Sequence, residues 1–301
     1  MTTFKGRVGV IGATSLIGEC LLPLLVEEGW DVVAFSHKAQ YIKHPLENEP
    51  ITWQLLKKLK SSGISDVHQT EKQITHWISL APILVLPEYF SILLLYGAKH
   101  VVAISSTSKY TKRVSSDPIE KALAERLAES EERLVAWAKK ENLTFTILRP
   151  TLVYGLGRDK NVSVIAGFIQ RFAFFPLFGA ARGLRQPVHA QDVALCCRAA
   201  LSAEKAFNRS YNISGGEILT YREMIKLIFS ALSRKPRFVT LPLWIFRVTV
   251  FCLRVLPPFR HWSTAMAERM NKDLVFDHED ARRDIGFSPR TFQLSREDLP
   301  R

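Results

Sequence analysis

The stretch GATSLIG, residues 12–18, has the composition of a phosphate-binding turn. It follows an apolar run typical of a buried strand and leads into a leucine-rich run typical of a helix. Gly12 permits a sharp turn, and Gly18 permits close packing of the helix on the strand. Such a turn directs backbone N–H groups and a helix N-terminus toward a pyrophosphate. The alternative is an ordinary strand–helix turn, but this position in an α/β chain predicts a dinucleotide site.

The residues after the second predicted strand indicate which dinucleotide would bind. Ser36, His37 and Lys38 follow the apolar run that begins at residue 30, and none of them is acidic. A carboxylate here would hold the ribose hydroxyls of NAD, whereas basic groups suit the additional phosphate of NADP. The pattern therefore favours NADP over NAD. The alternative is that His37 and Lys38 are simply solvated.

Three arginines, Arg149, Arg182 and Arg185, are candidates for binding a substrate phosphate. Guanidinium forks suit that task because they donate parallel hydrogen bonds to an oxyanion. His189 and Asp192 have the side chains for acid–base chemistry, but we expect a structural role for both. Asp192 would cap the helix that follows it, and His189 would pack in the core. The arginines are therefore the predicted substrate ligands.

The composition limits the classes of function. With 301 residues and 47% hydrophobic content, the chain can bury a large core. Its formal net charge of +12 suits an anionic partner, such as a phosphate-bearing small molecule or a membrane surface. We do not expect nucleic-acid binding, because the basic residues are dispersed and none of the usual motifs is present. The four cysteines show no metal-ligand spacing, so no metal site is predicted. No signal peptide precedes the first strand, and we expect a cytoplasmic protein.

Alternating strands and helices must position these residues. Further apolar strands are predicted within 75–82, 100–110 and 143–150, with a helical segment at 87–99 between the first two. This alternation predicts an α/β fold with a Rossmann-type, doubly wound parallel sheet. The region 39–73 is the hardest to interpret, and its pattern suggests a helix at 53–63.

A long helix is predicted at 118–140. Asp117 serves as N-cap, Pro118 takes the first helical position and Glu120 the third. Apolar residues then recur at helical spacing to form one buried stripe, while the charged residues are assigned to a solvated face. The members of the stripe are Leu123, Leu127, Leu134 and Ala138.

The carboxyl-terminal half supplies a smaller unit. A capping box, Thr220 with Glu223, begins a helix, and a shorter helix ends at Gly286. The apolar segment 241–259 is too short, and too interrupted by arginines, to span a bilayer comfortably. A core helix is the favoured interpretation. A wall for an apolar substrate and a helix on a membrane surface are the alternatives.

Taken together, these motifs resemble the extended short-chain dehydrogenase/reductase family, which holds nucleotide-sugar epimerases and dehydratases. The turn is similar to the family's Gly-x-x-Gly-x-x-Gly, with Ser15 at the middle glycine. The similarity covers nearly the whole chain. Other motifs that carry it are SLAP at 79–82, SSTS at 105–108, ILRPTLVYG at 147–155 and QPVHAQDVA at 186–194.

The resemblance implies a cofactor, a substrate class and a domain division. The cofactor would be NADP, with NAD as the alternative, and the substrate a nucleoside-diphosphate sugar. Residues 1–155 would form the cofactor domain, and 156–301 mostly a substrate domain, with 186–214 returning to the sheet. A homodimer stays open, as does peripheral membrane contact through 241–259. The implied cofactor-binding residues are Gly12, Thr14, Ser15, Leu16, Ile17, Gly18, Ser36, His37, Lys38, Leu80, Ala81, Pro82, Ser105 and Ser106.

One departure from the family bears on catalysis. The family's Tyr-x-x-x-Lys pair falls at Leu123 and Leu127, and residues 111–153 contain no tyrosine. Thr107 matches the family's catalytic Ser or Thr, and Tyr110 is the nearest alternative acid, although it is also typical of a surface loop. Two functions therefore stay open. One is an epimerase, dehydratase or reductase with a non-standard site, and the other is a non-catalytic NADPH-binding redox sensor or assembly subunit.

Overall fold

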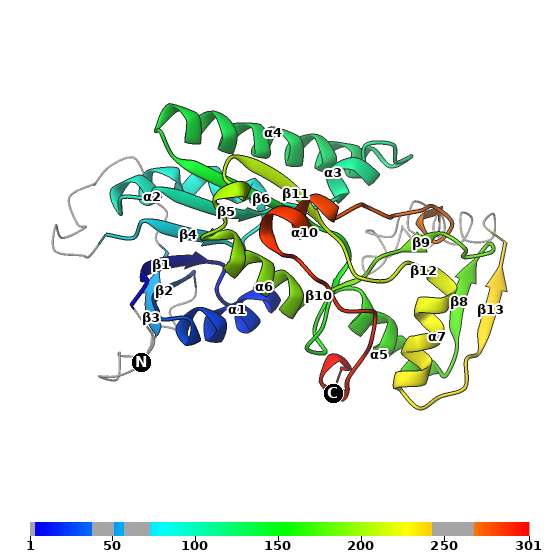
Figure 1. Cartoon of the computed structure of the whole chain (residues 1–301). Helices are drawn as coiled ribbons and strands as arrows, with labels where there is room; N and C mark the ends of the chain where they lie inside the picture. Colours follow the sequence, from blue (N-terminus) through cyan, green and yellow to red (C-terminus); the bar gives the residue numbers. More distant parts are fainter. Residues whose placement is uncertain (1–3, 38–50, 57–72, 243–267, 301) are drawn as a thin grey trace.

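A seven-stranded parallel sheet forms the centre of the protein (Figure 1). The computed structural model describes residues 4–37, 51–56, 73–242 and 268–300. The strand order is β11-β6-β5-β4-β1-β2-β3, so the chain changes direction across the sheet between β1 and β4. The strands are β1 (Gly6–Ile11), β2 (Trp30–Ser36), β3 (Ile51–Leu55), β4 (His76–Ser79), β5 (His100–Ile104), β6 (Thr144–Pro150) and β11 (Arg209–Ile213).

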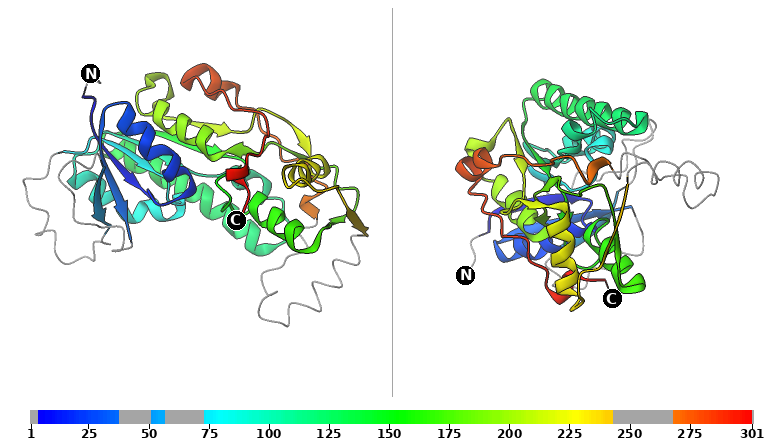
Figure 2. Two further views of the ribbon diagram at one scale, coloured as in Figure 1. Left: turned by 90° about the horizontal axis from the view of Figure 1, so that it is seen from below. Right: turned by 90° about the vertical axis from the view of Figure 1, so that its right-hand side faces the viewer.

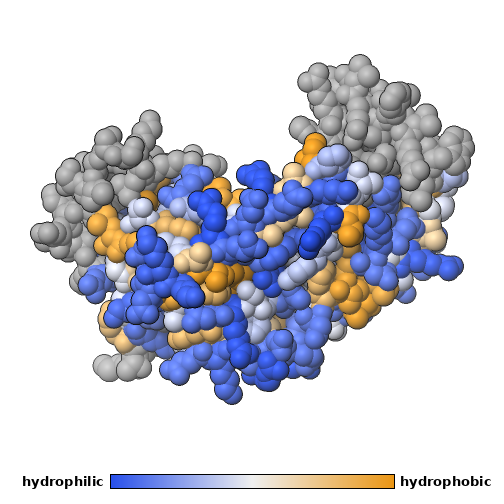
Figure 3. Space-filling view, turned by 90° about the horizontal axis from the view of Figure 1, so that it is seen from above, coloured by the Kyte–Doolittle hydropathy of each residue, from blue (hydrophilic) through white to orange (hydrophobic). Residues whose placement is uncertain are grey.

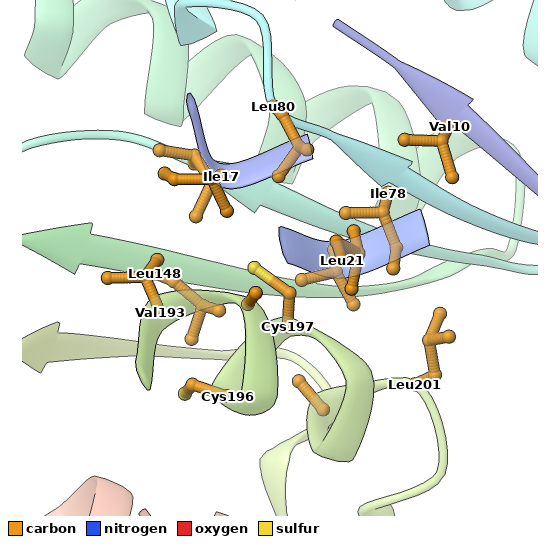
Figure 4. Close-up of a cluster of buried hydrophobic side chains, with 14 of the residues drawn as sticks. Val10, Ile17, Leu21, Ile78, Leu80, Leu148, Val193, Cys196, Cys197 and Leu201 are labelled. Carbon is orange, nitrogen blue, oxygen red and sulfur yellow. The ribbon is translucent and has the colours of Figure 1, made fainter. Parts of the chain in front are cut away.

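Helices cover both faces of the sheet, which explains why its strands are almost continuously apolar. One face carries α1 (Leu16–Glu27), α6 (Ala190–Ala200) and α10 (Glu279–Ile285). The other carries η3 (Ile83–Tyr89), α2 (Phe90–Leu95) and α4 (Pro118–Lys140). Figure 4 shows the first of these two cores, in which Leu21 of α1 and Cys197 of α6 lie among side chains of the sheet. Burial raises the pKa of Cys197 to about 12, which keeps this thiol protonated.

A smaller lobe lies at one end of the molecule (Figure 2). It contains a third cluster of buried side chains, formed largely by two helices and a strand pair. Its elements are α5 (Val162–Phe172), α7 (Tyr221–Ala231), the parallel pair β8 (Phe175–Phe178) and β13 (Phe238–Leu241), and the antiparallel pair β9 (Leu184–Arg185) and β12 (Leu219–Thr220). A parallel pair, β7 (Val153–Tyr154) and β10 (Val188–His189), flanks the first part of this lobe in the chain, which comprises α5, β8 and β9.

The lobe is interrupted in sequence by elements that belong to the sheet. From the stretch 186–214, α6 packs against α1, and β11 pairs in parallel with β6 as an edge strand. The remaining short elements are α3 (Ser108–Thr111), η4 (Glu204–Ala206) and η6 (Arg296–Asp298). The domain division at residue 155 stays a prediction.

The predicted fold class, a doubly wound parallel sheet, is confirmed. The start of α4 is also as predicted, because the Asp117 carboxylate accepts a hydrogen bond of 2.9 Å from the Ile119 N–H. The helix predicted at 53–63 is wrong at its beginning, where Trp53 and Gln54 extend β3 beside β2. Pairing with a neighbouring strand outweighs a short helical pattern there. Lys38 and all of 241–259 after Pro242 lie outside the described residues. Over the described ranges, no helix is both long and apolar enough to cross a membrane.

Candidate functional site

The carboxyl ends of the central strands bring most of the predicted site residues to one edge of the sheet. The turn 12–18 follows β1, Ser36 ends β2, Leu80 follows β4, and Ser105 follows β5. In a doubly wound sheet, ligands bind outside this edge at the point where the strand order reverses. Here that point lies between β1 and β4.

At this point the turn after β1 meets the turn after β4. Gly12 has φ of 77°, and a Cβ atom there would lie only 2.7 Å from the backbone nitrogen of Ala81. A side chain at position 12 would therefore clash with backbone as well as strain its own residue. Because Gly12 has no side chain, the backbone of the turn after β1 lies directly against the backbone of the turn after β4.

The turn continues into α1 through a serine cap. Ser15 is extended, and its Oγ accepts a hydrogen bond of 3.1 Å from the Gly18 N–H. A Cβ atom on Gly18 would lie 2.2 Å from the Ala13 carbonyl oxygen, so only glycine fits. The serine in place of the family's middle glycine thus stabilises the N-terminus of α1. In exchange, it occupies one of the N–H groups that could otherwise contact an anion.

The end of β2 presents a histidine and no acid. Ser36 is buried, whereas His37 is exposed and its Nε2 lies 2.9 Å from the Tyr89 hydroxyl. The centres of the His37 and Tyr89 rings are 5.9 Å apart. Tyr89 is the last residue of η3, which follows β4, so this segment contacts the histidine. Either ring nitrogen can carry the proton, depending on the tautomer.

A buried cluster of charges lies at the ends of β5 and β6. Glu131 of α4 accepts hydrogen bonds from Arg149 at 2.9 and 2.6 Å, from Lys109 at 2.7 Å and from the Ser105 hydroxyl at 2.6 Å. Burial alone would raise the pKa of Glu131, but these donors, led by Arg149, outweigh it and lower the pKa below its usual value. Glu131 is therefore ionised, and it ties α4 to the loop 105–110.

Thr107 and Tyr110 lie on this loop in different surroundings. The Thr107 hydroxyl is buried and donates to the Pro150 carbonyl at 3.2 Å. The Tyr110 side chain is 42% exposed, with the Arg149 guanidinium 5.7 Å and the Lys109 ammonium 5.9 Å from its ring centre. Its ring also lies 5.9 Å from that of Phe276. Tyr110 is thus accessible to a ligand and has two cations beside it.

Leu123 and Leu127, which the resemblance places at the family's Tyr and Lys positions, pack against the core beneath α4. Leu127 is 6% exposed within the cluster on this face of the sheet, and the partly buried Leu123 packs against the same cluster. Side chains of this kind cannot exchange protons.

The predicted substrate arginines are separated by their partners. Arg149 is committed to Glu131, and Arg182 is exposed in the loop before β9. Arg185 is buried, and its guanidinium donates to the backbone carbonyls of Leu184, Lys272 and Arg269. Burial lowers the pKa of Arg185 to about 10. The structure therefore argues against Arg185 as a phosphate ligand, because its donors are already used in holding the lobe together.

His189 is buried against Tyr154, as expected, but the capping role expected of Asp192 is revised. His189, not Asp192, caps α6, since its Nδ1 accepts from the Gln191 N–H at 3.1 Å. Its Nε2 lies 3.1 Å from Asp298, and this hydrogen bond helps to hold the pKa of Asp298 well below its usual value although burial opposes it. Asp192 is paired with Arg290 at 2.9 Å. Both side chains join the carboxyl-terminal segment to α6 rather than face an open site.

Glu131 is the residue that the sequence interpretation missed. The abundance of charges on this helix predicts that Glu131 belongs to the solvated face. Yet Glu131 lies four residues after Leu127 and three before Leu134, on the buried stripe itself. A charged residue at a core position of an otherwise regular stripe was the available signal.

Comparisons with known proteins agree with this architecture. The model of the NAD dependent epimerase/dehydratase family matches residues 8–214. UDP-glucose 4-epimerase of Vibrio cholerae is 23% identical over 162 residues, which are 54% of this chain and 47% of that protein. A mitochondrial NADH dehydrogenase subunit of Arabidopsis thaliana, 1 alpha subcomplex subunit 9, is 30% identical over 98 residues, 32% of this chain and 24% of that protein. The chain spans less than half the length of these two relatives.

Among solved structures, the fold is similar to that of UDP-glucuronic acid 4-epimerase from Bacillus cereus, determined in complex with UDP-glucuronic acid and NAD. The TM-score is 0.70 at 16% identity, and the match covers 97% of this chain and 96% of that one. At this level of identity the likeness concerns the fold alone.

Proposed function

This chain belongs to the NAD dependent epimerase/dehydratase family, and we propose that it binds NADP or NAD and acts on a nucleoside-diphosphate sugar or a related carbonyl or hydroxyl substrate. The observation that carries the proposal is the meeting of Gly12 with Ala81 at the switch point of the sheet. A backbone-lined floor beside the N-terminus of α1 suits a pyrophosphate, which needs close N–H groups and no side chain in between. The residues present therefore fit a dinucleotide.

The preference for NADP rests on the end of β2. His37 stands where a carboxylate would favour NAD, and its contact with Tyr89 fixes it at the edge of the proposed site. An imidazole N–H can donate a hydrogen bond to the additional phosphate of NADP, whereas a carboxylate would repel that phosphate. The substrate class is inferred from relatives whose names include UDP-glucose and UDP-glucuronic acid.

Tyr110 is the proposed proton-transfer group. A bound NAD(P) would supply the hydride acceptor or donor, and the chain would have to move a proton on the substrate. The Tyr110 side chain is partly exposed, and the Lys109 and Arg149 cations lie beside its ring, where they could orient an anionic substrate. Thr107 is the alternative, although its hydroxyl is already directed to Pro150.

A non-catalytic role is the second candidate, and one observation favours it. Leu123 and Leu127 contribute to the core and leave α4 without a proton-transfer group at these positions. Such a protein would still bind the dinucleotide and would serve as a redox sensor or as a subunit of an assembly. The similarity to an NADH dehydrogenase subunit is consistent with this alternative.

Calorimetric titration with NADPH and NADH tests cofactor binding. We expect tighter binding of NADPH, and we expect His37→Asp to shift the affinity ratio toward NADH by about tenfold, the effect of one charged hydrogen bond. His37→Asn is the matched control without the charge. Equal affinities of the parent for both would contradict the NADP preference, and binding of neither would contradict the assignment of the turn.

Turnover distinguishes the two candidate functions. NADPH oxidation and NADP reduction would be followed with a panel of sugar nucleotides and aldehydes in the parent, in Tyr110→Phe and in Thr107→Val. Epimerised and dehydrated sugar products would be separated by chromatography in the same reactions, because epimerisation and dehydration regenerate the cofactor. Loss of a positioned acid–base group lowers the rate by about 10² to 10⁴-fold. Tyr211→Phe is the control, because the Tyr211 hydroxyl donates a hydrogen bond to Asp284 of α10. Turnover that survives Tyr110→Phe would exclude Tyr110. Binding of cofactor without turnover on any member of the panel would favour the non-catalytic role.

A further inference from the structure

Helix α5 carries two apolar stripes. One face is buried against the smaller lobe's core and comprises Val162, Ala166 and Ile169. A second stripe is more exposed, with Val164 63% and Phe172 49% exposed, while Phe168 between them is partly buried and packs against the same core. These three residues follow one another at intervals of four, so they form a continuous stripe along the helix.

This stripe differs from the usual apolar content of a protein surface. Figure 3 shows hydrophobic side chains scattered among hydrophilic ones over one face of the molecule, which is normal and needs no explanation. A surface helix, by contrast, ordinarily turns one polar face to water. An outer face made of Val164, Phe168 and Phe172 is therefore expected to have a partner.

The stripe ends in a cluster of aromatic rings. The ring of Phe168 lies 4.7 Å from that of Phe172 and 5.7 Å from that of Phe174. The Arg171 guanidinium is 5.4 Å from the centre of the Phe172 ring. The carboxyl end of α5 thus presents phenylalanine side chains together with a cation.

More cations come to the same end from a distant part of the chain. The Arg234 guanidinium donates to the Ile169 carbonyl at 2.9 Å, and the Phe175 N–H donates to the Arg237 carbonyl at 2.9 Å. The loop that follows α7 therefore lies beside the end of α5. Arg171, Arg234, Lys235 and Arg237 are all exposed.

No acidic residue offsets these charges within the two segments that build this surface. Residues 160–178 and 224–242 contain no Asp or Glu. Their basic residues are Lys160, Arg171, Lys226, Arg234, Lys235 and Arg237.

We propose that an aromatic–basic patch docks the protein on an anionic phospholipid surface. The patch consists of Val164, Phe168, Phe172 and Phe174 together with Arg171, Arg234, Lys235 and Arg237. Apolar side chains would enter the boundary between headgroups and acyl chains, while the cations would meet lipid phosphates. The patch suits a bilayer better than nucleic acid, since aliphatic Val164 and the helical stripe add nothing to binding a phosphate backbone. A bilayer uses both the apolar and the basic part.

Vesicle co-sedimentation of the full chain tests the proposal. Vesicles of phosphatidylcholine alone would be compared with vesicles that also contain phosphatidylglycerol. One variant, Val164→Ser/Phe172→Ser, removes the apolar part. Its control is Val114→Ser/Ile119→Ser, which changes two exposed apolar residues, one just before α4 and one in its first turn. A second, Arg171→Gln/Lys235→Gln/Arg237→Gln, removes charge without altering core packing. Its control, Arg133→Gln/Lys139→Gln/Lys140→Gln on exposed positions of α4, changes the net charge equally.

We expect the parent and both controls to bind the anionic vesicles and to be released by salt of about 0.5 M. Each patch variant should show at least about a tenfold lower partition coefficient, given the attraction of several cations and the apolar contact. Patch variants that bind like the parent would overturn the proposal, as would equal binding to vesicles without phosphatidylglycerol. Absence of vesicle binding by the parent would also overturn the proposal. In that case, loss of affinity for a DNA oligonucleotide in the charge variant would indicate nucleic acid as the partner. Loss of self-association in the apolar variant would indicate a second copy of the chain.

Discussion

Glu131 and Arg149 form a two-pronged ion pair, with Nε to Oε1 at 2.9 Å and Nη2 to Oε2 at 2.6 Å. The side chains are only 3% and 13% exposed, so solvent screens the pair little. Lys109 brings a second cation to the same carboxylate. The pair therefore joins α4 to β6, and through Lys109 it fixes the loop that carries the two candidate hydroxyl groups.

Glu131→Leu should destabilise the protein by about 3–5 kcal/mol, because it leaves two cations beside an apolar core. Glu131→Leu/Arg149→Leu should recover part of this loss, since it removes one uncompensated charge. Urea denaturation measures both. Glu279→Leu, which removes an exposed ion pair with Arg282, is the control and should change little. A cost for Glu131→Leu no larger than that of the control would contradict the assignment of a buried network.

His100 should make stability fall with acid. Burial, reinforced by the neighbouring His76, lowers the pKa of His100 to about 4. The unfolded chain, with a pKa of about 6.5, binds the proton that the folded protein rejects, so stability decreases as the pH falls from about 6.5 to 4. The slope contributed is at most about 1.4 kcal/mol per pH unit.

His100→Leu should flatten the pH dependence over this window, as measured by urea denaturation at a series of pH values. The groups around the ring are His76, Phe207 and the Thr144 hydroxyl, with Lys99 acting on His76. Among described residues, His100 Nε2 makes no hydrogen bond of normal geometry. Backbone groups of Ala200 and Thr144 favour the protonated ring, but burial outweighs them and keeps the pKa low. An unchanged slope in His100→Leu, matching that of the control His37→Leu at an exposed position, would show that other groups cause the acid sensitivity.

Leu127→Ala should destabilise the protein by about 2–4 kcal/mol through loss of buried contacts and the cavity left behind. Leu123→Ala should cost less, since Leu123 is only partly buried. Neither change should alter the dissociation constant of NADPH. If Leu127→Ala weakens the cofactor without destabilising the fold, this side chain contacts the ligand and the packing role assigned to it is wrong.

Gly12→Ala should lower cofactor affinity at least about tenfold, because the added Cβ would force the turns after β1 and β4 apart. Gly167→Ala in α5 is a matched control, since a Cβ there meets no atom within 4 Å. Helix propensity predicts that the control gains up to about 1 kcal/mol of stability. Calorimetry with NADPH and thermal unfolding separate the two effects, and undiminished affinity in Gly12→Ala would contradict a cofactor site at this turn.

Features written into short sequence windows were predictable. Asp117 and Pro118 predict the start of α4, and Gly12 and Gly18 predict the turn, because caps and tight turns depend on a few adjacent residues. The strand at Trp53 was missed, since its conformation is determined by pairing with β2 and not by its own spacing.

Interactions between distant residues were not predictable. The burial of Glu131 depends on Arg149 and Lys109, and the use of Arg185 as a structural donor depends on carbonyls of Arg269 and Lys272. Nothing in a local pattern specifies such partners. A residue type shows which hydrogen bonds a side chain can make, but tertiary contacts decide whether a guanidinium is free for a substrate.

The return of α6 and β11 to the sheet has a consequence for synthesis on the ribosome. The face of α1 that carries Leu21 and Leu25 is covered by α6, and β11 pairs with the edge of β6 that faces away from β5. Both partners are translated after most of the smaller lobe's first helix and strand have emerged. Until then a nascent chain exposes an apolar helix face and an open strand edge, and we expect both to favour aggregation. A fragment that ends at residue 155 would keep both surfaces uncovered permanently.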